Sequence, residues 1–154
     1  MRFPFESHVR PDGSRKLYRL FLGLAAGLVL IIFLFSLTPP AASESQSNFV
    51  VDLLAWLTGF DLEPLFVRKL AHFAEYALLG GLLAGALAQT KWRLADAGRL
   101  WLVGFAVAFL DESLQMFSGR GPAIADVWLD AAGALFGLLT ALGLAALRRG
   151  KQAR

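Results

Sequence analysis

The stretch VRKLAHFAEYALLGG, residues 67–81, places a lysine, a histidine, a glutamate and a tyrosine inside an otherwise apolar run. On a helix, Lys69, His72 and Tyr76 fall on one stripe, and Glu75 lies at its edge. An ammonium group can hold an anion. An imidazole with a neighbouring carboxylate can act as a general base or a nucleophile. The residue types of this segment therefore suit either the binding or the chemistry of an anionic group.

A second polar stretch, DESLQMFSGRGPAIADVWLD, covers residues 111–130. Within it, Asp126 and Asp130 lie one helical turn apart on the same face. We expect Glu112 or Asp126 to orient the imidazole of His72 or to act as an acid, which makes these three the candidate catalytic residues. The candidate ligand-binding residues are Lys69, Glu75, Tyr76, Gln115, Arg120 and Asp130.

A metal site is the weaker interpretation of these residues. Its ligands would be His72, Glu75 and Glu112, but the nearby charges of Lys69 and Arg120 would repel a cation. The chain has only two histidines and no cysteine, which excludes disulfides and thiolate metal sites. No glycine-rich phosphate loop occurs. We therefore predict no metal, no cofactor and no nucleic-acid partner.

The elements that must position these residues are apolar blocks. A bilayer core of ~30 Å needs about 20 helical residues, and four blocks meet this length. They cover residues 17–38, 70–89, 100–117 and 126–147. The prediction is an all-α, four-transmembrane-helix bundle with three parts. These are a cytoplasmic arm (1–16), a membrane domain (17–147) and a basic cytoplasmic tail (148–154).

Two segments leave alternatives open. The first block could be a cleaved signal peptide, although its apolar stretch is longer than the 7–15 residues typical of such peptides. The connection that follows contains NFVVDLLAWLTGF, residues 48–60, with apolar residues near helical spacing. It forms either a short interfacial helix with Trp56 at headgroup depth or a loop packed on the bundle.

The placement of positive charge predicts the orientation. With the N-terminus inside, twelve of the fifteen Lys and Arg residues lie on the cytoplasmic side, and three lie outside. The positive-inside rule then puts both termini in the cytoplasm. The three exceptions, Arg68, Lys69 and Arg120, accompany the acids and the histidine described above.

The cost of burying charge predicts that these polar residues face one another. An Asp, Lys or Arg at the centre of a membrane helix costs ~2.5–3.5 kcal/mol, and such residues usually face a bundle interior or a wet cavity. Three segments bring polar groups to the same depth, so we expect a shared pocket near the outer surface. Pairs of glycines four residues apart, which allow close helix packing, occur at Gly23/Gly27, Gly81/Gly85 and Gly133/Gly137.

These residues together resemble the VanZ-like family of bacterial membrane proteins over roughly residues 66–145. The family pattern is Lys-x-x-His-Phe-x-x-Tyr, then Glu-x-x-Gln, then Arg and Asp-x-x-x-Asn-x-x-Gly-x-x-x-Gly. Two positions depart from it, because Arg68 stands where Asp is frequent and Asp130 stands where Asn is usual. The matching positions are Lys69, His72, Phe73, Tyr76, Glu112, Gln115, Arg120, Asp126, Gly133 and Gly137.

The resemblance implies a membrane location and, through the family's namesake, a connection to low-level resistance to the glycopeptide teicoplanin. It supplies no reaction. Two functions therefore stay open: binding or remodelling of an anionic cell-envelope or lipid headgroup, and an enzyme that acts on a phosphate-containing lipid-linked headgroup with His72 as base or nucleophile. The expected partner is a membrane lipid or a lipid-linked cell-wall precursor. Association into a homo-oligomer is left open.

Overall fold

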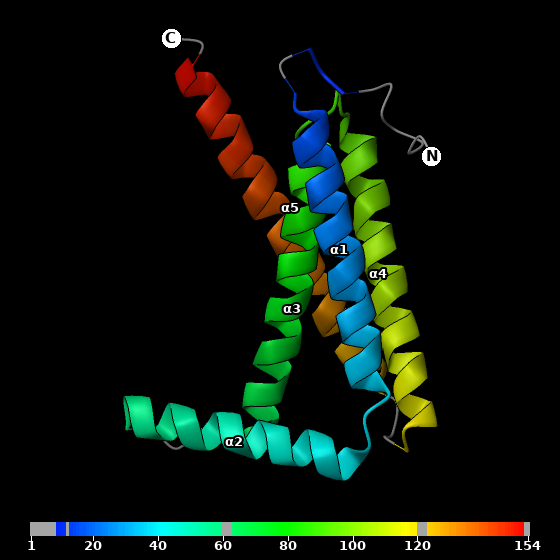
Figure 1. The fold of residues 1–154 in the computed structure, drawn as a ribbon, viewed down its shortest axis with the longest axis vertical. Helices are drawn as coiled ribbons and strands as arrows, with labels where there is room; N and C mark the ends of the chain where they lie inside the picture. Colours follow the sequence, from blue (N-terminus) through cyan, green and yellow to red (C-terminus); the bar gives the residue numbers. More distant parts are fainter. Residues whose placement is uncertain (1–8, 12, 60–62, 120–122, 153–154) are drawn as a thin grey trace.

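The computed structural model describes residues 9–11, 13–59, 63–119 and 123–152. Within these ranges the chain is helical, apart from turns and one isolated bridge between Val9 and Thr90, so the all-α prediction is confirmed. The helices are α1 (Arg15–Ser36), α2 (Pro40–Thr58), α3 (Pro64–Leu87), α4 (Leu94–Phe117) and α5 (Ile124–Gln152). Helix α1 begins and helix α5 ends at one end of a bundle, and α2 lies across the opposite end, which we call the α2 end (Figure 1).

Four of these helices are long and apolar enough to cross a membrane. The candidate spans are Arg15–Ser36, Pro64–Leu87, Leu94–Phe117 and Ile124–Arg148. Most residues in the apolar stretches of these spans are not buried inside the bundle. In the apolar stretch of α1 only 17% of the residues are buried. Large apolar side chains thus cover the outside of the bundle, as is expected of helices that face hydrocarbon.

Helices α3 and α4 begin six residues earlier than the apolar blocks at 70 and 100 indicated. Pro64 occupies the first turn of α3, where a missing N–H costs nothing. Helix α4 begins with a capping arrangement in which the backbone N–H of Arg93 donates to Asp96 Oδ2 at 2.8 Å. Charged residues lower the hydropathy of these first turns without interrupting the helix, so hydropathy alone places the boundary too late.

Helix α2 decides between the two alternatives for the first connection. It is a helix of 19 residues, longer than the short helix that the sequence pattern indicated. Proline at its first position favours the start, and Gly59, with φ of 73°, ends it in the left-handed conformation. Helix α2 packs on α3 and leaves Phe49, Trp56 and Leu57 largely exposed, as suits a helix at a membrane interface.

Glycines let α3 and α5 pack most extensively of all helix pairs. A Cβ atom at Gly137 would overlap the carbonyl oxygen of Ala77, and one at Gly133 would overlap that of Phe73. From the other side, a Cβ at Gly80 would overlap the carbonyl oxygen of Ala134. The backbones of the two helices therefore touch directly.

The other two glycine pairs, on α1 and α3, do not make the close backbone contacts that their spacing predicted. A Cβ atom at Gly23 or Gly27 of α1 would meet nothing within 4 Å, so their spacing makes no helix contact in the described residues. Gly85 of α3 faces the ring of Phe21, and Gly81 only approaches Gly137. Close backbone packing is thus confined to the α3–α5 pair among these motifs.

Candidate functional site

Polar side chains from four helices meet near the α2 end of the bundle. They come from the last turn of α1, the first half of α3, the last half of α4 and the first turns of α5. We call them the polar cluster. Its members are Ser36, Lys69, His72, Tyr76, Asp111, Glu112, Asp126 and Asp130.

Asp111 accepts hydrogen bonds from two other members of the cluster, and it has no exposed surface. Its Oδ1 accepts a hydrogen bond from Ser36 Oγ, and its Oδ2 accepts one from Tyr76 Oη at 3.2 Å. This single carboxylate therefore links α1, α3 and α4. The neighbouring side chain of Glu112 is buried as well.

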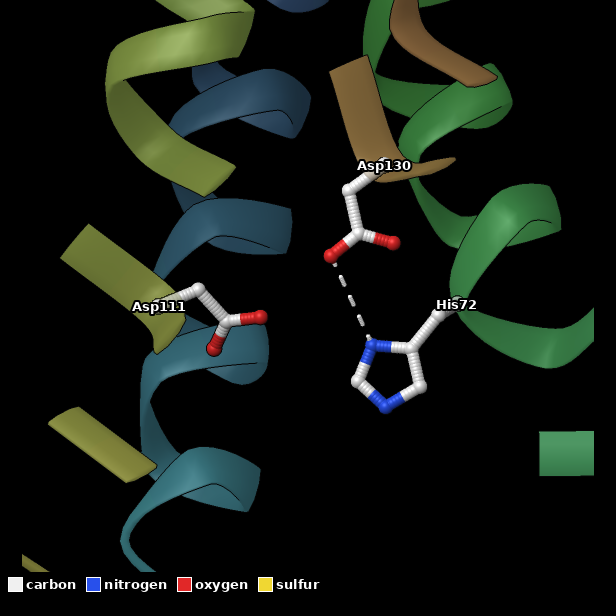
Figure 2. Close-up of side chains that lie close together, drawn as sticks. All are labelled: His72, Asp111 and Asp130. Atoms are coloured by element: carbon white, nitrogen blue, oxygen red, sulfur yellow. Dashed lines mark ion pairs between the residues drawn. The ribbon is translucent and has the colours of Figure 1, made fainter. Parts of the chain in front are cut away.

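His72 faces Asp130 across the interface of α3 and α5. The distance between His72 Nδ1 and Asp130 Oδ2 is 3.8 Å, and Asp130 is only 2% exposed. Figure 2 shows both side chains and that of Asp111 directed into one shared space. One imidazole nitrogen and two carboxylate oxygens there lie within 4.8 Å of one another, close enough to be ligands of one metal ion.

Two further carboxylates interact at the start of α5. Asp126 Oδ1 lies 3.3 Å from Lys69 Nζ, and both side chains are partly exposed. Glu112 accepts a hydrogen bond from the backbone N–H of Ala123, the residue before α5. Asp126 therefore pairs with a lysine, and Glu112 accepts a hydrogen bond from the backbone at a helix start. The carboxylate that faces His72 belongs to Asp130.

A cavity of about 250 Å³ opens beside the cluster at the α2 end. It brings together Lys69, His72, Gln115, Asp126 and Asp130, all of which were candidates from the sequence. Arg68 of α3 and Glu44 of α2 also line it, and neither was among those candidates. Among the residues that the structure describes, the lining is Pro40, Glu44, Arg68, Lys69, His72, Gln115, Gly119, Asp126, Leu129 and Asp130.

Glu75 lines a second cavity, of about 230 Å³, between α1, α2 and α3. Arg68 and His72 contribute to both cavities, so the imidazole stands between them. Tyr76 is fully buried and reaches neither cavity. Arg120, the remaining candidate, lies outside the described residues.

Asp111 and Ser36 are the two cluster members that were not among the candidate residues. Asp111 at least belongs to the polar stretch 111–130, whereas nothing in the sequence indicated Ser36. It ends an apolar helix, and one hydroxyl in such a helix gives no signal of its own, since serine commonly donates to the carbonyl four residues earlier. Ser36 Oγ indeed lies 2.8 Å from the carbonyl oxygen of Ile32. Only its contact with Asp111 distinguishes it.

Comparison with known proteins gives one match. The family model described as VanZ/LLP1 matches residues 21–146, which include the four spans almost entirely and the whole polar cluster. No curated protein and no solved structure matches the chain.

Proposed function

The chain belongs to the VanZ/LLP1 family of membrane proteins, and from this premise we propose that its cavity at the α2 end binds or remodels an anionic lipid headgroup. The cavity would open on the extracytoplasmic side of the bacterial inner membrane, with both termini in the cytoplasm. Twelve of the fifteen Lys and Arg residues support this orientation. A lipid-linked cell-wall precursor is one source of such a headgroup, and it would connect the protein to glycopeptide tolerance.

The observation that carries the proposal is the side-by-side arrangement of both charge signs in the cavity. Arg68 and Lys69 line it together with Glu44 and Asp126. A guanidinium can hold a phosphate through two hydrogen bonds, and an ammonium acts as a point charge. The ammonium of Lys69 has three N–H donors, so its pairing with Asp126 leaves donors for a phosphate. The acids and Gln115 suit an amine or hydroxyl groups of the same headgroup.

Removing the two cations should strongly weaken headgroup binding. For the double variant Arg68→Met/Lys69→Met, we expect at least a tenfold loss of phosphatidylglycerol retained per chain. Hydrogen bonds to charged groups contribute about 1.5–3 kcal/mol each, and about 1.4 kcal/mol is a factor of ten. Native mass spectrometry of the purified protein, reconstituted with phosphatidylglycerol and then transferred to detergent, measures the bound lipid.

The matched control is Lys91→Met/Arg148→Met, which removes two cations from the opposite end of the bundle. It should retain lipid as the unmodified chain does. Equal lipid retention by both double variants would contradict the proposal. An equal loss would mean that lipid binding depends only on net charge, and full retention by both would mean that Arg68 and Lys69 do not hold the headgroup.

A second candidate function, an enzyme acting on such a headgroup, is favoured by the approach of Asp130 to His72. A carboxylate facing one imidazole nitrogen can orient the ring so that the other nitrogen accepts a proton from an attacking water or hydroxyl group. Arg68 and Lys69 would stabilise charge that develops on the phosphate.

The change His72→Gln separates the two functions. Glutamine keeps a hydrogen-bonding side chain but cannot act as a base at neutral pH, so turnover should fall by about 10²–10⁴-fold. The measurement is headgroup release from phosphatidylglycerol vesicles containing the purified protein, followed by mass spectrometry. Turnover that survives the change would exclude catalysis by this histidine, and lipid retention would then remain as the function under test.

A further inference from the structure

Three potential metal ligands meet inside the bundle beside the cavity. They are the imidazole of His72 on α3, the carboxylate of Asp111 on α4 and the carboxylate of Asp130 on α5 (Figure 2). Their ligand atoms lie within 4.8 Å of one another. With bonds of ~2.1 Å, tetrahedral ligand atoms stand about 3.4 Å apart. Small side-chain rotations would therefore close the three groups around one ion.

Asp130 provides independent support for a ligand in this space. The side chain is 97% buried, and its Oδ1 accepts no hydrogen bond from any residue that the structure describes. Its Oδ2 is 3.8 Å from His72 Nδ1, which is too long for a hydrogen bond. Buried carboxylate oxygens normally have partners, and a ligand in this space would supply the partner that Oδ1 lacks among the described residues.

Charge balance indicates a divalent cation as that missing partner. Asp111 and Asp130 would bring two negative charges into a low-dielectric interior, where isolated charges are costly. One divalent cation compensates both charges and binds a neutral imidazole at the same time. A single proton on His72 would compensate only one of the two.

The hydrogen bonds around Asp111 resemble the support that metal-binding carboxylates receive. Ser36 and Tyr76 each donate to one of its oxygens. Each carboxylate oxygen has two acceptor positions, so both hydrogen bonds leave a position for a metal. Outer hydrogen bonds of this kind orient ligands in metal sites.

From these observations we infer that His72, Asp111 and Asp130 bind one divalent transition-metal cation, of the Mn²⁺ or Zn²⁺ class. A nitrogen and two carboxylate oxygens suit such ions. Three protein ligands leave at least one coordination position for water or another oxygen ligand. The inference does not depend on headgroup binding, because none of the three ligands is one of the cations proposed to hold the phosphate.

The arrangement also answers two parts of the objection that the sequence raised against a metal, the charge of Lys69 and the choice of ligands. That objection rested on repulsion by Lys69 and Arg120 and assumed Glu75 and Glu112 as ligands. In the structure Lys69 is compensated by Asp126 at 3.3 Å, and Asp111 and Asp130 take the places of the two glutamates. Asp130 also stands where the resembled family pattern has Asn, and an amide would not supply the second negative charge.

The test is Mn²⁺ binding by the full chain, purified in detergent, stripped with EDTA and then freed of chelator. We expect one Mn²⁺ per chain, measured by the loss of the electron paramagnetic resonance signal of free Mn²⁺, and displacement of that ion by Zn²⁺. Asp130→Asn keeps the shape of the side chain and should weaken binding at least tenfold. The matched control Asp52→Asn, on the exposed face of α2, should bind as the unmodified chain does.

A second measurement, made on the unmodified protein, tests the inference even if a variant fails to fold. In the unmodified protein, bound Mn²⁺ should show electron spin-echo modulation from the nitrogen of His72, and His72→Gln should remove it. The inference is overturned by an unmodified chain that binds neither Mn²⁺ nor Zn²⁺, by Asp130→Asn that binds as tightly as Asp52→Asn, or by bound Mn²⁺ without a nitrogen signal. None of these results would bear on lipid retention.

Discussion

Gly137→Leu is expected to lower the free energy of unfolding by about 3 kcal/mol or more, the largest effect on stability of any single change considered. Even a Cβ atom at this position would overlap the carbonyl oxygen of Ala77 on α3. The obstacle is backbone, so no change of rotamer can relieve the overlap. The two helices would have to separate, and they carry His72 and Asp130 on their facing sides.

Denaturation by sodium dodecyl sulfate in mixed micelles, followed by tryptophan fluorescence, measures this loss. The matched control is Gly143→Leu on the same helix, where a Cβ meets nothing within 4 Å. It should change the free energy of unfolding by less than about 0.5 kcal/mol. Equal destabilisation by both variants would show that leucine is harmful anywhere on α5 and would refute the direct contact of the α3 and α5 backbones.

Asp111→Ala is expected to have the second largest effect on stability, a loss of about 2–4 kcal/mol. It leaves the hydroxyls of Ser36 and Tyr76 without this acceptor, and a buried group without its partner costs about 1–3 kcal/mol. Relief from burying a carboxylate offsets part of that cost. Ser36 keeps its contact with the carbonyl of Ile32, so the hydroxyl of Tyr76 contributes the larger share.

A double-mutant cycle tests that explanation. Tyr76→Phe should cost about 1.5–3 kcal/mol in the unmodified chain. In Asp111→Ala it should cost nothing and should restore part of the lost stability, because it removes the buried hydroxyl that has lost its acceptor. The measurements are made in EDTA so that a bound metal does not add to the stability. Equal costs of Tyr76→Phe in both backgrounds would mean that this hydrogen bond does not stabilise the protein.

The proposed metal and the proposed headgroup would be neighbours. His72 and Asp130 belong both to the three-residue metal group and to the lining of the cavity with Arg68 and Lys69. An open coordination position on the ion would face a phosphate held by these two cations. In that case Mn²⁺ should tighten lipid binding in the unmodified chain and leave it unchanged in Asp130→Asn.

The sequence was sufficient for the spans and for most of the polar residues that lie near the α2 end. Apolar length is a local property, so four membrane-length helices follow from four blocks. Helical periodicity puts Lys69, His72 and Tyr76 on one stripe, and the cost of exposing charge to hydrocarbon turns that stripe toward other helices. The resemblance to the VanZ-like family rested on a few of these polar residues and glycines, and the match of the VanZ/LLP1 family model to residues 21–146 confirms it.

The partner of each residue was decided only by the tertiary structure. His72 faces Asp130 and Asp111. The sequence favoured Glu112 or Asp126 as the partner of the histidine, but Glu112 accepts a hydrogen bond from the backbone of Ala123, and Asp126 pairs with Lys69. Periodicity fixes which residues share a face of one helix, but not how far that helix is rotated or shifted against another. In this bundle the contact of Gly133 and Gly137 with the α3 backbone determines both, because helices that touch at glycine have little freedom to slide.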